Sequence, residues 1–231
     1  MRLLLFTLYL FLLPLFFFGQ KTRQSIEQLS QIDQALSAFR QEKLEEACPA
    51  IDRVWQVQPN LALQNQDLQS QELRYVRIAC HLLHGNKSAV GEAAHFIRET
   101  PVIVWKDRLH YLLGNYYFLQ QNWSAAIIEY KLATLDNLSN AEIAVLQFSQ
   151  GYSHFVLKQF DQAKPFLNSI RQLPGATYQV PATYYYGLIL YGEGKLTEAM
   201  TCFQQVESDS KFGTLAVFYR SQIMLSRGQA V

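Results

Sequence analysis

The sequence lacks the local patterns by which most enzymes and nucleic-acid-binding proteins are recognised. It holds no glycine-rich phosphate loop, and no serine or cysteine lies in the context of a nucleophile elbow. The 20 Lys and Arg residues are balanced by 19 Asp and Glu residues, which leaves no basic excess for contact with nucleic acid. We therefore expect a protein that is not an enzyme and that binds neither nucleic acid nor a small-molecule substrate.

Cysteine is scarce, with three residues in the chain, Cys48, Cys80 and Cys202. The number is odd, no two of them have CxxC spacing, and each falls within a helical pattern of apolar residues. We interpret all three as small buried apolar residues and not as a disulfide framework.

Histidine is also scarce, and its placement is the nearest approach to a metal site. His81 and His84 lie three residues apart, with His95 further along, and three imidazoles with a water can hold zinc. No carboxylate or cysteine completes an established spacing, and His84 lies at a turn. We interpret these histidines as structural or surface residues, and we predict no metal and no other cofactor.

The N-terminus carries the one long apolar stretch. Residues 3–18 are apolar almost without interruption, after a single Arg2 and before a polar segment. This length is short of the roughly 20 residues of a spanning helix and is typical of a secretory signal. Phe17, however, stands where cleavage prefers a small residue. Residues 1–19 are thus predicted to be either a cleaved signal peptide or an uncleaved membrane anchor, which would tether the protein. Either alternative places residues 20–231 in the periplasm or cell envelope.

From residue 25 onward, apolar residues recur at the three- and four-residue spacing of amphipathic helices. Small residues mark a longer repeat: Gly114, Gly151 and Gly187 lie 37 and 36 residues apart. An alanine follows each of these glycines by 12 residues, at Ala126, Ala163 and Ala199. We expect pairs of helices joined by tight turns, with Ala126 facing Gly114 across the third pair.

This pattern resembles the tetratricopeptide repeat (TPR) family, whose period is about 34 residues with small residues on both helices. The family positions are occupied by Leu113, Gly114, Tyr117, Ala126, Tyr130 and Ala133. Residues 151–167 are similar in style to long secreted or envelope-associated bacterial TPR proteins. The resemblance implies an all-α fold, an α-solenoid wound as a right-handed superhelix. Its units are about 28–61, 72–105, 107–140, 144–179 and 180–213, with a partial sixth unit at 214–231.

The resemblance also implies a binding groove, because the first helix of each TPR unit lines the concave face. The family positions carry over to Arg108, Tyr111, Asn115, Phe118, Phe148, Tyr152, Phe155, Tyr184 and Tyr191. Exposed rings at this density suit an extended peptide or a partner helix. The alternative is that several of these rings only pack one first helix against the next.

The last residues have the pattern of another first helix, with Ser221 in the small-residue place and Gly228 at the turn. Solenoids normally end in a polar cap. We therefore expect either a longer array or an end covered by a partner, with self-association at this end as one form of the second alternative.

The sequence as a whole predicts a non-catalytic scaffold or adaptor of the cell envelope that binds a protein or peptide in its concave groove. One alternative is a structural spacer within a larger envelope assembly. Another is the repeat domain of a longer enzyme or signalling protein.

Overall fold

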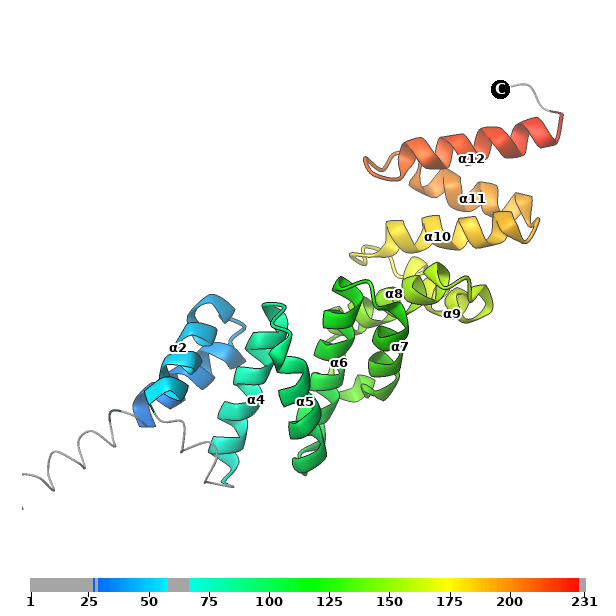
Figure 1. The fold of residues 1–231 in the computed structure, drawn as a ribbon. Coiled ribbons are helices and arrows are strands. Elements are labelled where there is room, and N and C mark those ends of the chain that lie inside the picture. The colour runs from blue at the N-terminus through cyan, green and yellow to red at the C-terminus, as the bar shows by residue number, and fades with distance from the viewer. Residues whose placement is uncertain (1–26, 28, 58–66, 229–231) are drawn as a thin grey trace, which may run out of the picture. The chain divides into compact units, whose positions relative to one another are not determined.

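A computed structural model of the chain describes residue 27 and the ranges 29–57 and 67–228 (Figure 1). The predicted signal or anchor at residues 1–19 lies outside them. The described residues form helices and connecting turns with no strand, which confirms the all-α prediction. Within the same ranges, no helix combines the length and the apolar character that a membrane crossing requires. The chain divides into two compact units, Met1–Arg98 and Glu99–Val231.

The first unit is built from helical residues 29–40, α2 (Leu44–Val57), α4 (Leu68–Leu83) and α5 (Ser88–Glu99). Its core is made by residues that recur every three or four positions on each helix and are almost fully buried, including Leu36, Ile51, Ile78 and Phe96. Around this core, Arg40 forms an ion pair of 2.6 Å with Glu72 of α4.

A disulfide joins α2 to α4, between Cys48 and Cys80, whose Cα atoms lie 5.5 Å apart. The interpretation of these two cysteines as unpaired apolar residues is therefore wrong. They are separated by 32 positions, and only the packing of α2 against α4 brings them together. Cys202 is free and buried, as predicted, and burial raises the pKa of its thiol.

The described residues of the second unit, 99–228, form seven α-helices in succession, coloured from green to red in Figure 1. They are α6 (Ile103–Leu119), α7 (Trp123–Leu132), α8 (Asn140–Val156), α9 (Phe160–Arg171), α10 (Gln179–Gly192), α11 (Leu196–Val206) and α12 (Gly213–Ser226). A 3₁₀ turn, η1 (Leu135–Asn137), precedes α8. Each helix packs on the next, and α8 also packs on α6 and α10. We call α6, α8, α10 and α12 the first helices, and α7, α9 and α11 the second helices.

The glycines of the first helices lie where a second helix comes closest. A β-carbon on Gly114 would lie 2.5 Å from ring atoms of Tyr130, and one on Gly187 would lie 2.9 Å from Cys202 and 3.1 Å from Phe203. A β-carbon on Gly151 would likewise lie 2.9 Å from Phe166 and 3.1 Å from Leu167. The side chain nearest to Gly114 is thus Tyr130 and not the predicted Ala126, which is fully buried one helical turn earlier.

The turns between paired helices share one backbone geometry. A residue with positive φ lies in each of them, at Glu42, Gly85, Gln121, Lys158 and Gly194. The next residue donates its N–H to the carbonyl five positions back, for example Asn122 to Tyr117 and Lys195 to Leu190, both at 2.9 Å. This is the Schellman arrangement, which satisfies carbonyls at the end of a helix. The predicted turns at Gly85, Gln121 and Gly194 are confirmed.

Three helices begin one turn earlier than the predicted unit boundaries. α4, α6 and α8 begin at Leu68, Ile103 and Asn140, four residues before the expected starts at 72, 107 and 144. Two of these starts have side-chain caps. Asp67 accepts a hydrogen bond from the N–H of Ser70, and Ser139 forms a capping box with Glu142. The caps extend the helices through polar residues that carry no apolar periodicity.

Candidate functional site

Five rings contributed by four helices meet around Tyr152 in the second unit. Tyr152 of α8 lies 5.9 Å from Phe118 of α6 and 5.6 Å from Trp123 of α7, measured between ring centroids. On its other side it lies 4.9 Å from Tyr185 of α10. We call Phe118, Trp123, Tyr152, Phe155 and Tyr185 the aromatic cluster; each of its rings is half-buried. Edge-to-face contacts predominate in it, as ring quadrupoles favour.

The repeat explains why these rings converge. Phe118 and Phe155 each lie four residues after a glycine, so they occupy the same place near the end of α6 and α8. The turn that follows brings Trp123, the first residue of α7, to within 5.3 Å of Phe118. Tyr152 lies one residue after Gly151, on the side of α8 that contacts both α6 and α10.

Burial also changes the pKa of a tyrosine in the aromatic cluster. The pKa of the Tyr185 hydroxyl is raised, first because the ring is buried and next because it lies beside Tyr152. Its phenol therefore stays neutral across the physiological range.

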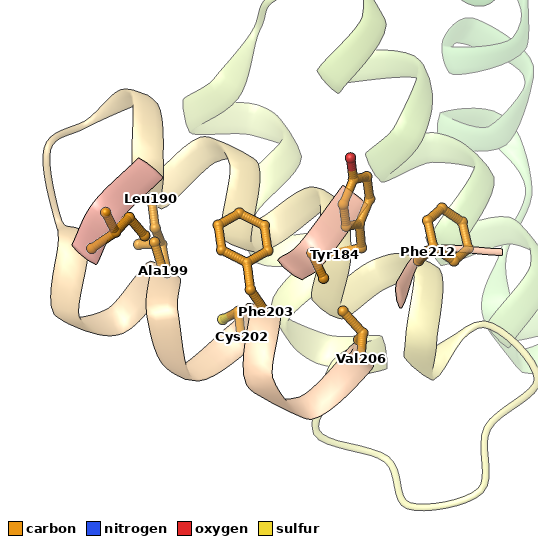
Figure 2. Close-up of a cluster of buried hydrophobic side chains, with 9 residues drawn as sticks. Tyr184, Leu190, Ala199, Cys202, Phe203, Val206 and Phe212 are labelled. Carbon is orange, nitrogen blue, oxygen red and sulfur yellow. The ribbon is translucent and has the colours of Figure 1, made fainter. Parts of the chain in front are cut away.

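Three of the predicted groove rings lie within the core. Tyr111, Phe148 and Tyr184 occupy equivalent places three residues before the glycines and are only 7%, 8% and 5% exposed. Phe148 is stacked on Tyr178 at 4.6 Å, and Tyr184 lies 4.9 Å from Phe212. Figure 2 shows Tyr184 between Phe203 and Phe212. These contacts agree with the alternative that some rings pack one first helix on the next.

The two polar residues predicted for the groove already have partners inside the unit. Arg108 donates from Nη2 to Glu142 at 2.7 Å, and Glu142 in turn caps the start of α8. The Asn115 carbonyl oxygen accepts a hydrogen bond of 2.8 Å from the hydroxyl of Tyr130. Arg108 therefore ties α6 to α8, and Asn115 ties α6 to α7.

The structure brings Phe118, Tyr152 and Phe155 together and leaves Tyr191 elsewhere. Tyr191 lies against Tyr219 of α12, at 5.3 Å. Exposed aliphatic side chains flank the cluster in sequence: Leu119 follows Phe118 and is 73% exposed, and Val156 follows Phe155 and is 37% exposed.

Four rings that complete this arrangement were not among the predicted groove residues. Trp123 and Tyr185 belong to the aromatic cluster, while Tyr178 and Phe212 cover Phe148 and Tyr184. Tyr178 and Phe212 directly precede α10 and α12, and they lie 34 residues apart. That spacing is a signal that a search restricted to helix positions misses.

The first unit holds a polar cluster of a different kind. His81 lies 3.0 Å from Asp52, and Arg77 forms an ion pair of 2.9 Å with Glu92 while its guanidinium lies 4.7 Å from the ring centroid of Trp55. His84 contacts the carbonyl of Cys80 at 2.7 Å. In the ranges 29–57 and 67–228, no three ligand-type side chains gather where a metal ion would be held.

Comparisons with known proteins identify no relative of the chain. The chain matches no protein-family model, and a search of curated proteins finds none that is similar to it.

Proposed function

We propose that this chain is an exported, non-catalytic helical repeat protein whose second unit binds a protein partner at the aromatic cluster. The observation that carries the proposal is the cluster itself. Its five rings come from four helices, α6, α7, α8 and α10, and are only half-buried, although the same unit buries other rings such as Tyr184 almost completely. Large rings with partial exposure and adjacent aliphatic side chains are typical of protein-binding surfaces.

The proposed architecture is a TPR-type α-solenoid. Support comes from the recurrence of one turn geometry at Gln121, Lys158 and Gly194, which are 37 and 36 residues apart. The same helix contact also recurs at the three glycines. Repeated hairpins with a small residue at each closest approach stack into superhelices in this class of protein.

Export is supported by two independent features. Residues 3–18 have the composition of a secretory h-region. The Cys48–Cys80 disulfide is of a kind that persists in the periplasm and other oxidising compartments and is reduced in most cytosols.

The proposed partner is a peptide segment, either extended or helical, with apolar side chains directed at the cluster. The Leu119 and Val156 side chains would widen the apolar contact, and the Tyr152 and Tyr185 hydroxyls would offer hydrogen bonds to a peptide backbone. Arg108 and Asn115, which already have partners within the unit, would contribute by holding α6 against its neighbours.

The test is site-specific photocrosslinking of the full chain in its native cells. A photoreactive residue at Leu119 is expected to give an adduct of discrete mass, and Tyr152→Ala is expected to reduce its yield several-fold. The matched control is Ile128, which is 59% exposed on α7 and should give no such adduct. Equal adducts at both sites, or none at Leu119, would contradict binding at the cluster. Circular dichroism of Tyr152→Ala would separate loss of binding from loss of folding.

A structural spacer is the second candidate, and the burial of Tyr111, Phe148 and Tyr184 favours it. In this role the rings would only stiffen the stack of helices. A spacer predicts that Tyr152→Ala lowers the unfolding temperature without changing any crosslink at Leu119.

A further inference from the structure

The last helix, α12, repeats the residue pattern of the other first helices. In those helices a glycine is followed four residues later by a ring, as in Gly187 and Tyr191. In α12 the corresponding residues are Ser221 and Leu225, and Gly228 adopts the positive φ of 71° found at the other turns.

The environment of this pattern differs in α12. Phe218 lies three residues before Ser221, in the place that Tyr111, Phe148 and Tyr184 occupy before their glycines. Those three rings are 5–8% exposed, whereas Phe218 is 54% exposed and Leu225 is 58% exposed. Among the described residues, no second helix covers Ser221 as Tyr130 and Phe203 cover Gly114 and Gly187. We call Phe218, Ser221 and Leu225 the α12 stripe.

The paired helices show what kind of element covers such a stripe. The second helix runs antiparallel to the first and carries its own small residue with a large one four positions later, as in Ala199 and Phe203. The large residue lies over the glycine of the first helix. In an antiparallel register with Phe203 beside Gly187, a residue four positions after Gly187 falls opposite one four positions before Phe203, which pairs Tyr191 with Ala199. Each helix thus places a large side chain opposite the small residue of the other.

The α12 stripe contains both kinds of residue that this pairing requires, one small and one large. Ser221 is small, and Leu225 is large and four residues later, so a second α12 in antiparallel orientation would set Leu225 of each copy opposite Ser221 of the other. Such a contact is isologous and closes with two-fold symmetry, which limits the assembly to a dimer.

Charge does not oppose this contact. The only charged residue of α12 is Arg220, and it forms an ion pair with Glu207 of its own unit. Burial of the α12 stripe would therefore remove apolar surface from water without burying an unpaired charge at the centre of the interface.

We infer that the α12 stripe is a homodimer interface, in which two copies of the chain pair their last helices antiparallel and two-fold symmetric around Ser221 and Leu225. The inference does not depend on what the aromatic cluster binds.

The first test is sedimentation velocity of the full chain over a range of concentrations, in a mild detergent that covers its apolar N-terminal residues. A concentration-dependent dimer is expected. Phe218→Ser should weaken the dimer by roughly 30-fold or more, because truncating a ring that is buried in an interface can cost about 2 kcal/mol or more. Ile128→Ser, at a similarly exposed position on α7, should leave the dimer unchanged.

The second test determines whether the two copies of α12 pair in the proposed antiparallel orientation. Gln222→Cys lies near the proposed two-fold axis and should form a disulfide-linked dimer under mild oxidation, whereas Thr214→Cys, at the start of the same exposed helix, should not.

Three results would overturn the inference. One is a wild-type chain that stays monomeric while Phe218 is accessible to oxidative labelling. Another is a monomer in which Phe218 is protected, which would show that a further segment covers α12. The third is a dimer whose affinity is the same in Phe218→Ser, which would place the interface elsewhere.

Discussion

The ring of Tyr130 lies directly over Gly114, so close that a β-carbon at Gly114 would come within 2.5 Å of two ring atoms. Tyr130 is 2% exposed, and its hydroxyl is held by Asn115 at 2.8 Å. The ring therefore has no room to move away, and the contact sets how closely α6 and α7 approach.

Gly114→Ala is expected to destabilise the second unit by about 1–3 kcal/mol, because the added methyl overpacks a full core. Gly192→Ala is the control: it is also helical, but nothing lies within 4 Å of its β-carbon position, so we expect a change below about 0.5 kcal/mol. Urea unfolding followed by circular dichroism measures both. Equal stability of the two variants would contradict the close contact.

The positive-φ turns predict stabilising substitutions. Gln121 and Lys158 adopt φ values of 57° and 59°, where a side chain costs about 1 kcal/mol relative to glycine. Gln121→Gly and Lys158→Gly should each raise the free energy of unfolding by up to about 1 kcal/mol. Gly194→Ala, at the equivalent turn with φ of 75°, should lower it by a similar amount. If all three changes had the same sign, the shared turn geometry would be wrong.

Loss of the Cys48–Cys80 disulfide should destabilise the first unit by about 3–4 kcal/mol, from the loop entropy of its 32-residue separation. Thermal unfolding of the Cys48→Ala, Cys80→Ala double variant measures this loss. A reductant should lower the unfolding temperature of the wild type and leave the double variant unchanged. Cys202→Ala, which removes only the free thiol of the second unit, should retain the response to reductant.

The stability of the second unit should fall as the solution is acidified. His154 is 3% exposed, and burial lowers the pKa of its imidazole below the ordinary value of 6.5. The unfolded chain therefore binds this proton more readily than the folded chain. The stabilising contribution is complete above about pH 6.5 and is lost as the pH falls through the folded pKa.

His154→Phe isolates this effect, because a ring can keep the stacking on Phe166, 5.9 Å away. Denaturant unfolding at pH 7 and pH 5 should show a smaller loss of stability in the variant than in the wild type. Parallel losses would assign the pH dependence to other groups.

Much of the local structure was predictable because it depends on residues that are near in sequence. The turns at Gly85 and Gly194 follow from glycine's tolerance of positive φ, and the helices follow from apolar spacing. The starts of α4 and α8 were predicted one turn late, since capping by Asp67 and Ser139 acts through polar side chains that the apolar pattern ignores.

The candidate site was predicted in part. Phe118 and Phe155 occupy equivalent positions of α6 and α8, which pack on each other, and Tyr152 of α8 contacts both rings. Tyr111, Phe148 and Tyr184 were also predicted to line the groove, but they are buried. Family positions specify which side of a helix a residue occupies, whereas the loop rings Tyr178 and Phe212 decide whether that side is covered.

The sequence by itself determined the all-α class, the helical hairpins and their 36–37-residue recurrence, because turn geometry and amphipathic spacing are local properties of the chain. Only the tertiary structure decided the pairing of Cys48 with Cys80, the seating of Tyr130 on Gly114 and the exposure of Phe218. Each of these depends on how closely two helices approach, and that distance is set by the packing of many side chains together and not by any one segment.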